Sequence, residues 1–76
     1  MKELVEAIAK ALVDHPDQVE VCVIEGEEVI LFELRVHAMD IAKVIGRDGR
    51  MIDAIRTILN SAGMKLHKRV SFEILD

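Results

Sequence analysis

The first residues of the chain carry apolar side chains at helical spacing. Residues 2–14 place charged residues between these positions, so the pattern predicts an amphipathic helix over residues 2–14. Pro16 disfavours helical geometry at His15, and we expect the helix to end there. The apolar positions of this stripe are Leu4, Val5, Ile8 and Leu12.

The next segment, "QVEVCVIEGEEVILFELRVH", alternates apolar and polar residues with a period of two. This alternation predicts two strands, and "EGE" around Gly26 predicts the turn of a hairpin between them. We expect one face of each strand to point inward. The inward-facing residues are Val19, Val21 and Val23 in the first strand and Ile30, Phe32, Leu34 and Val36 in the second.

Two helices are predicted in the second half of the chain. Asp40 has the character of an N-cap residue before the short helix "IAKVI", and Gly46 is expected to end that helix. A second helix is expected to start just after Gly49 and to stop near Gly63. Its apolar stripe consists of Ile52, Ile55, Ile58 and Leu59.

The last segment, "KRVSFEILD", predicts a third strand with Val70, Phe72 and Ile74 on one face. The order α-β-β-α-α-β indicates an α+β fold in which three helices cover one face of a three-stranded sheet. We find no linker or repeat, and we expect residues 1–76 to form a single domain.

Composition limits the chemistry that this chain can carry. Cys22 is the only cysteine, which excludes an internal disulfide and a cysteine zinc cluster. The three histidines share no metal-ligand spacing, and no nucleophile-base pair can be assembled, so we expect neither a cofactor nor an enzyme. The N-terminal segment is neither a signal peptide nor a membrane span, which favours a cytoplasmic protein without membrane contact.

Charge is distributed unevenly along the chain. Residues 1–40 carry three basic and ten acidic residues, a net charge of −7, within a total of −4. Residues 41–69 carry seven basic and two acidic residues, a net charge of +5. Such asymmetry predicts a localised anion site in an otherwise acidic molecule.

The segment "KVIGRDGRMI", residues 43–52, places two glycines among basic residues within that basic region. The start of a helix presents unpaired N–H groups and a partial positive charge. Glycines allow a phosphate to approach those groups without meeting a Cβ atom. The segment therefore predicts a phosphate-binding turn between two helices.

The same residues resemble a known signature. Val44 to Ile52 are similar to the V-I-G-x-x-G-x-x-I motif of the KH domain, and the element order resembles its prokaryotic, type II arrangement. The similarity covers the whole chain. Its length and its opening "MKELVEAIAKALVDHPDQVEV" are similar to the small single-domain bacterial KH proteins of the KhpA type.

This resemblance implies binding of single-stranded nucleic acid, chiefly RNA, by a loop that clamps the sugar-phosphate backbone. By the resemblance, Lys43, Arg50 and the more distant Arg56 are flanking phosphate contacts, and Arg35 reaches the site from a strand edge. The implied clamp consists of Gly46, Arg47, Asp48 and Gly49. The implied wall of the base groove consists of Ile41, Val44 and Ile52, which core packing would explain equally well.

The resemblance also implies a cellular role and partners. It suggests an RNA chaperone or post-transcriptional regulator, linked to cell division and cell shape. It further suggests a homodimer, or a heterodimer with a larger Jag-type KH protein.

Two other interpretations remain open from the residues alone. A helix-turn-helix DNA-binding module would use Arg50, Arg56 and Asn60 to read bases. An interaction protein with this fold and no nucleic-acid binding is favoured by the acidic total and by Asp48. A carboxylate in a phosphate clamp repels the ligand unless it points away or caps the following helix.

Overall fold

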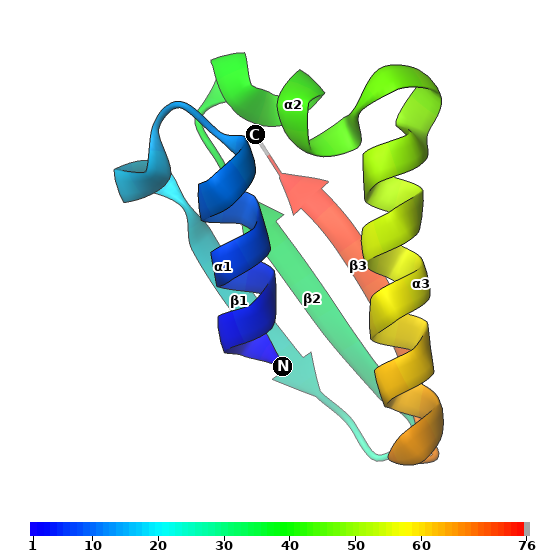
Figure 1. The fold of residues 1–76 in the computed structure, drawn as a ribbon. Helices are drawn as coiled ribbons and strands as arrows, with labels where there is room; N and C mark the ends of the chain where they lie inside the picture. The colour runs from blue at the N-terminus through cyan, green and yellow to red at the C-terminus, as the bar shows by residue number, and fades with distance from the viewer. Residues whose placement is uncertain (76) are drawn as a thin grey trace.

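The computed structural model describes residues 1–75, which form three α-helices and one three-stranded sheet (Figure 1). The elements are α1 (Lys2–Leu12), β1 (Glu20–Glu25), β2 (Val29–Arg35), α2 (Ile41–Ile45), α3 (Arg50–Lys65) and β3 (Arg69–Leu75). Single 3-10 turns cover Pro16–Gln18, Ala38–Asp40 and Arg47–Gly49. The expected order α-β-β-α-α-β is confirmed.

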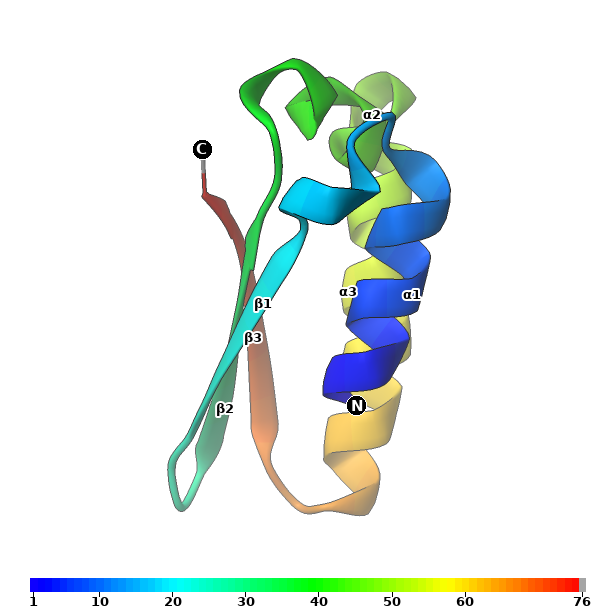
Figure 2. The same cartoon turned by 90° about the vertical axis from the view of Figure 1, so that its left-hand side faces the viewer.

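The sheet has the order β1-β2-β3. β1 and β2 form the expected antiparallel hairpin, and the amide of Gly26 donates to the carbonyl of Val29 at 2.8 Å in its turn. β2 and β3 are parallel, because α2 and α3 carry the chain back before β3 begins. Figure 2 shows α1 and α3 on the same side of the sheet, with α2 above its upper end, which confirms the predicted α+β architecture.

The core lies between this sheet and the helices. Alternation along β2 buries Ile30, Phe32 and Leu34 against the helices and leaves the residues between them on the opposite face. The apolar faces of the helices complete the core, but Leu4 (44% exposed) and Ile58 (47% exposed), which the helical spacing placed on those faces, lie outside it. Their buried members are Val5 and Ala9 in α1, Val44 in α2, and Ile55 and Leu59 in α3.

Asp40 occupies the predicted N-cap position of α2, but its side chain makes no capping hydrogen bond. The carboxylate instead accepts hydrogen bonds from His15, on the loop between α1 and β1. The predicted N-cap position of Asp40 is therefore confirmed, but the expectation that its side chain caps α2 is wrong. The carboxylate thus binds His15, which is distant in the sequence, in place of the first amides of α2.

Gly63 was expected to end the second long helix, and this expectation is also wrong. The helix continues to Lys65, and Gly63 is buried within its last turns. A Cβ atom at this position would lie 2.5 Å from Cγ2 of Val70 and 2.8 Å from the carbonyl oxygen of Lys68. The glycine therefore allows α3 to pack closely on the start of β3.

Among residues 1–75, no helix has both the length and the apolar character that crossing a membrane requires.

Candidate nucleic-acid interface

The glycine loop begins at a residue whose conformation is almost restricted to glycine. Gly46 ends α2 with φ 78° and ψ 173°, and its amide donates to the carbonyl of Ala42 at 2.9 Å. A Cβ atom here would lie 2.7 Å from Cβ of Met51 and 2.9 Å from the Met51 amide nitrogen. The bare backbone of Gly46 is thus pressed against the first turn of α3.

Asp48 and Gly49 turn the chain into α3 by adopting left-handed conformations in succession. Asp48 has φ 55° and ψ 26°, and Gly49 has φ 74° and ψ 13°. Aspartate tolerates this region better than most residues, because its short polar side chain can interact locally. This conformation accounts for an acid in the loop. Capping does not, since no side chain within residues 1–75 caps the start of α3.

Two arginines flank this uncapped helix start. Arg47 lies in the loop and Arg50 is the first residue of α3, and both side chains are exposed. Neither forms an ion pair with any residue in the described part of the chain. Their guanidinium groups are therefore available to an anion that approaches the first amides of α3.

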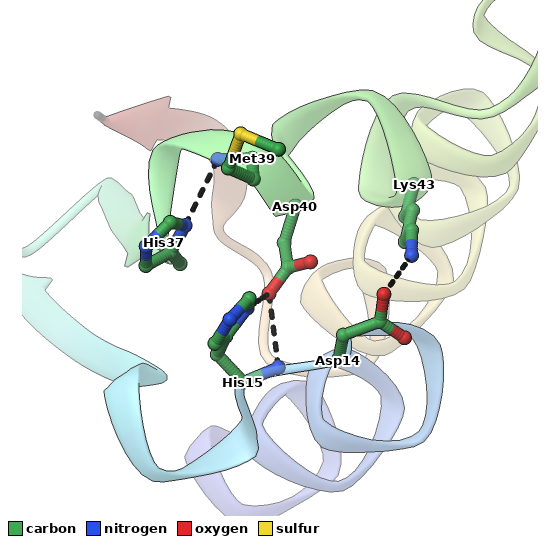
Figure 3. A network of polar contacts seen from close by, with 6 residues as sticks. All are labelled: Asp14, His15, His37, Met39, Asp40 and Lys43. Carbon is green, nitrogen blue, oxygen red and sulfur yellow. Dashed lines mark hydrogen bonds and ion pairs between the residues drawn. The ribbon is translucent and has the colours of Figure 1, made fainter.

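Lys43 was also expected beside the loop as a cation free to bind phosphate. In the structure its ammonium group contacts the carboxylate of Asp14, in the loop after α1 (Figure 3). The hydrogen bond that Lys43 donates to Asp14 raises the pKa of Lys43, against the opposing effect of desolvation. The lysine is charged, but it is already paired.

The three aliphatic residues of the expected groove wall differ in accessibility. Val44 is 0% exposed and belongs to the core, so it cannot line a groove. Ile41 and Ile52 are half-buried and pack against the core with part of each side chain open to solvent. Only these two remain candidates for contact with a base.

Arg35 is not brought to the loop. It lies in β2, which is the central strand and not an edge, between Glu20 of β1 and Leu75 of β3. Its side chain is exposed and alternates with the buried residues of β2, so it lies on the sheet face away from the helices. The expectation that Arg35 reaches the site from a strand edge is wrong.

A cleft between α3 and the edge strand β3 contains residues that the sequence did not assign to a base groove. Arg56 of α3 donates to the carbonyl of Phe72 at 3.4 Å and lies 3.7 Å from Asp53. The sequence did not show that β3 is an edge strand. This information was needed to predict the cleft, because only an edge strand leaves backbone carbonyls such as that of Phe72 accessible. The cleft is lined by Arg56, Asn60, Val70, Ser71, Phe72 and Glu73.

A second polar network joins the loop after α1 to the start of α2 (Figure 3). The His15 amide and ring Nδ1 lie 3.0 and 2.9 Å from Oδ2 of Asp40, and the His15 ring stacks on His37 with centroids 4.1 Å apart. Desolvation would raise the pKa of the Asp40 carboxyl. The hydrogen bonds from His15 and the backbone outweigh it and hold that pKa below its usual value.

The fold and the loop define a KH-type arrangement, and comparison with known proteins identifies its family. The family model described as "KhpA/KhpB, KH domain" matches residues 2–74. The chain belongs to this family, as the sequence resemblance predicted. Membership decides against the helix-turn-helix alternative, and the family is non-enzymatic, as expected.

Curated relatives match along almost their whole length. The chain is 51% identical over 75 residues to a protein of Clostridium acetobutylicum, covering 99% of this chain and 100% of the relative. It is 50% identical over 76 residues to a protein of Aquifex aeolicus, covering 100% and 96%. Both relatives are named "RNA-binding protein KhpA". No solved structure gave a significant match to this chain.

Proposed function

We propose that this protein binds single-stranded RNA through the backbone of the loop formed by residues 46–49. The observation that carries the proposal is a start of α3 that no side chain caps, flanked by two arginines without ion-pair partners among residues 1–75. Such a helix start offers amide donors and positive potential to a phosphate. The names of the relatives supply the ligand class, RNA.

In this proposal the sugar-phosphate strand passes over Gly46 and Gly49, with Arg47 and Arg50 contacting phosphates. Bases then follow the cleft between α3 and the edge of β3, where Arg56, Asn60 and Glu73 offer polar contacts. The chain has two phenylalanines and no tryptophan or tyrosine, and Phe32 and Phe72 are both buried. Affinity therefore comes from phosphate contacts and aliphatic packing instead of aromatic stacking.

We propose further that the protein works in the cytoplasm as an RNA chaperone or post-transcriptional regulator, with a role in cell division and cell shape. A single clamp of this size binds weakly, so a second module raises the effective affinity. That module is a second copy of this chain or the KH domain of a larger Jag-type protein. The matched family description, which joins KhpA with KhpB, supports such pairing.

The test of the clamp is the substitution Arg47→Asp, which places two acids side by side in the loop. We expect a loss of RNA affinity of at least about tenfold, because a hydrogen bond to a charged group contributes about 1.5–3 kcal/mol. The measurement is fluorescence anisotropy with labelled single-stranded RNA, with duplex DNA as competitor. Arg47 is exposed, so the melting temperature and circular dichroism spectrum should not change.

A matched control is Lys2→Asp, which makes the same change of charge at the start of α1. Figure 1 shows that this end of the molecule lies opposite the glycine loop. The control should leave RNA affinity close to that of the wild type. If Arg47→Asp binds RNA as tightly as Lys2→Asp does, the clamp assignment is rejected.

A further inference from the structure

The cation nearest the glycine loop on α2 is occupied by an acid of the same chain. Lys43 lies three positions before Gly46, and its ammonium group contacts Oδ2 of Asp14. Both side chains are accessible, with 43% of Lys43 and 68% of Asp14 exposed. A pair this open to solvent can exchange partners, because exposed ion pairs contribute little to stability.

The backbone beside Asp14 is held in place by the adjoining residue. The amide and ring of His15 both bond Oδ2 of Asp40, at 3.0 and 2.9 Å, and Asp40 is 0% exposed. Asp40 immediately precedes α2, the helix that carries Lys43 (Figure 3). The loop is therefore fixed to the helix it faces, and only the Asp14 side chain is free to leave Lys43.

We propose that Asp14 sets the RNA affinity of the site by competing with a backbone phosphate for Lys43. The proposal rests on the RNA-binding function proposed above. A carboxylate and a phosphate oxygen accept the same N–H donors, so they exclude each other at one ammonium group. Binding of a phosphate at Lys43 breaks the contact with Asp14 and leaves that carboxylate to water, which its exposure permits.

Two consequences distinguish this competition from a general effect of negative charge. Removing the carboxylate at residue 14 frees Lys43 for one additional phosphate contact. For single strands each such contact adds about 0.7 to the steepness of the salt dependence of binding. Removing a nearby acid that does not pair with Lys43 changes the net charge equally and adds no contact.

The experiment compares Asp14→Asn with Asp17→Asn, which is an exposed acid of the same loop with no ion pair within residues 1–75. We expect Asp14→Asn to bind single-stranded RNA about two- to fivefold more tightly, the range that an exposed ion pair supports. Its plot of log affinity against log salt should be steeper by about 0.7. Asp17→Asn should resemble the wild type in both measurements.

A second variant shows whether the effect passes through Lys43. In a Lys43→Gln background, the additional substitution Asp14→Asn should leave RNA affinity unchanged. Equal affinities of Asp14→Asn and Asp17→Asn, or a gain that persists in the Lys43→Gln background, would overturn the proposal. If RNA binding is still weakened by Arg47→Asp in that case, the proposed function stands although this proposal fails. A wild-type protein that ignores RNA at low salt removes both proposals together.

Discussion

The two glycines of the loop share a positive φ, but their surroundings impose different demands. Gly46 combines φ 78° with ψ 173°, a region that is essentially limited to glycine, and it presses on the backbone of Met51. Gly49 has a left-handed helical conformation, and a Cβ atom there would meet only Cγ2 of Ile52, at 3.9 Å. The motif therefore contains one position fixed by both conformation and contact, and another fixed by conformation alone.

Alanine substitutions should separate these two requirements. We expect Gly49→Ala to lower the free energy of unfolding by about 1–2 kcal/mol, the cost of a left-handed non-glycine residue. Gly46→Ala should cost more, about 3 kcal/mol or above, because strain in the backbone is joined by a steric clash. Urea unfolding followed by circular dichroism measures both. Equal losses for the two variants would contradict the distinction.

At the scale of elements, the contact between α3 and β3 reverses an ordinary rule of helix stability. Alanine is about 1 kcal/mol more favourable than glycine inside a helix. Gly63 lies inside α3, but its missing side chain is the space that Val70 and the Lys68 carbonyl occupy. The position is set by packing between the helix and the strand that follows it.

We therefore predict that Gly63→Ala destabilises the protein in spite of its better helix propensity. Overpacking costs about 1–3 kcal/mol, and Cβ contacts as short as 2.5 and 2.8 Å raise that cost above the gain of about 1 kcal/mol in propensity. The control is Ser61→Ala, which changes an exposed residue of the same helix and should alter stability by less than about 0.5 kcal/mol. Thermal unfolding of both variants decides the matter. A higher melting temperature for Gly63→Ala would show that the contact yields without cost.

Elements that depend on periodicity could be predicted from the sequence. The alternation of β2 identified its buried residues, because such a pattern is a local property of the chain. The stripe of α1 found the buried Val5, but it missed the buried Ala9 and included the exposed Leu4. The role of a residue that depends on a partner far away in the sequence could not be predicted in this way. Asp40 has the residue type of a cap, but a histidine 25 positions away binds it instead.

The site was predictable to the same extent. The loop conformation follows from its glycines, and the motif placed it between two helices. The pairing of Lys43 with Asp14 and the position of Arg35 on the far sheet face both depend on which strands and loops become neighbours. A sequence pattern does not say which strands and loops become neighbours, so it could not predict the Lys43–Asp14 pair or the position of Arg35.

On the scale of the whole molecule, Asp40 joins two parts of the chain that form separate regions of structure. Its carboxylate is buried between the loop after α1 and the start of α2, and its partner His15 lies in that loop. The hydrogen bonds to this carboxylate favour its ionised form. They hold its pKa below the ordinary value although burial alone would raise it.

The contribution of Asp40 to the free energy of unfolding should therefore decrease as the pH is lowered. Because the folded-state pKa of Asp40 is lowered, its contribution is complete above the ordinary aspartate pKa of about 3.9 and is lost as the pH falls through the folded value. We predict that the variant Asp40→Asn is less stable than the wild type at pH 7 and that this difference narrows below about pH 4. The measurement is urea unfolding at a series of pH values.

The control is Asp17→Asn, which alters an exposed acid of the same loop and should keep the wild-type dependence of stability on pH. A constant difference between wild type and Asp40→Asn down to pH 2 would show that the buried carboxylate does not stabilise the fold through its charge.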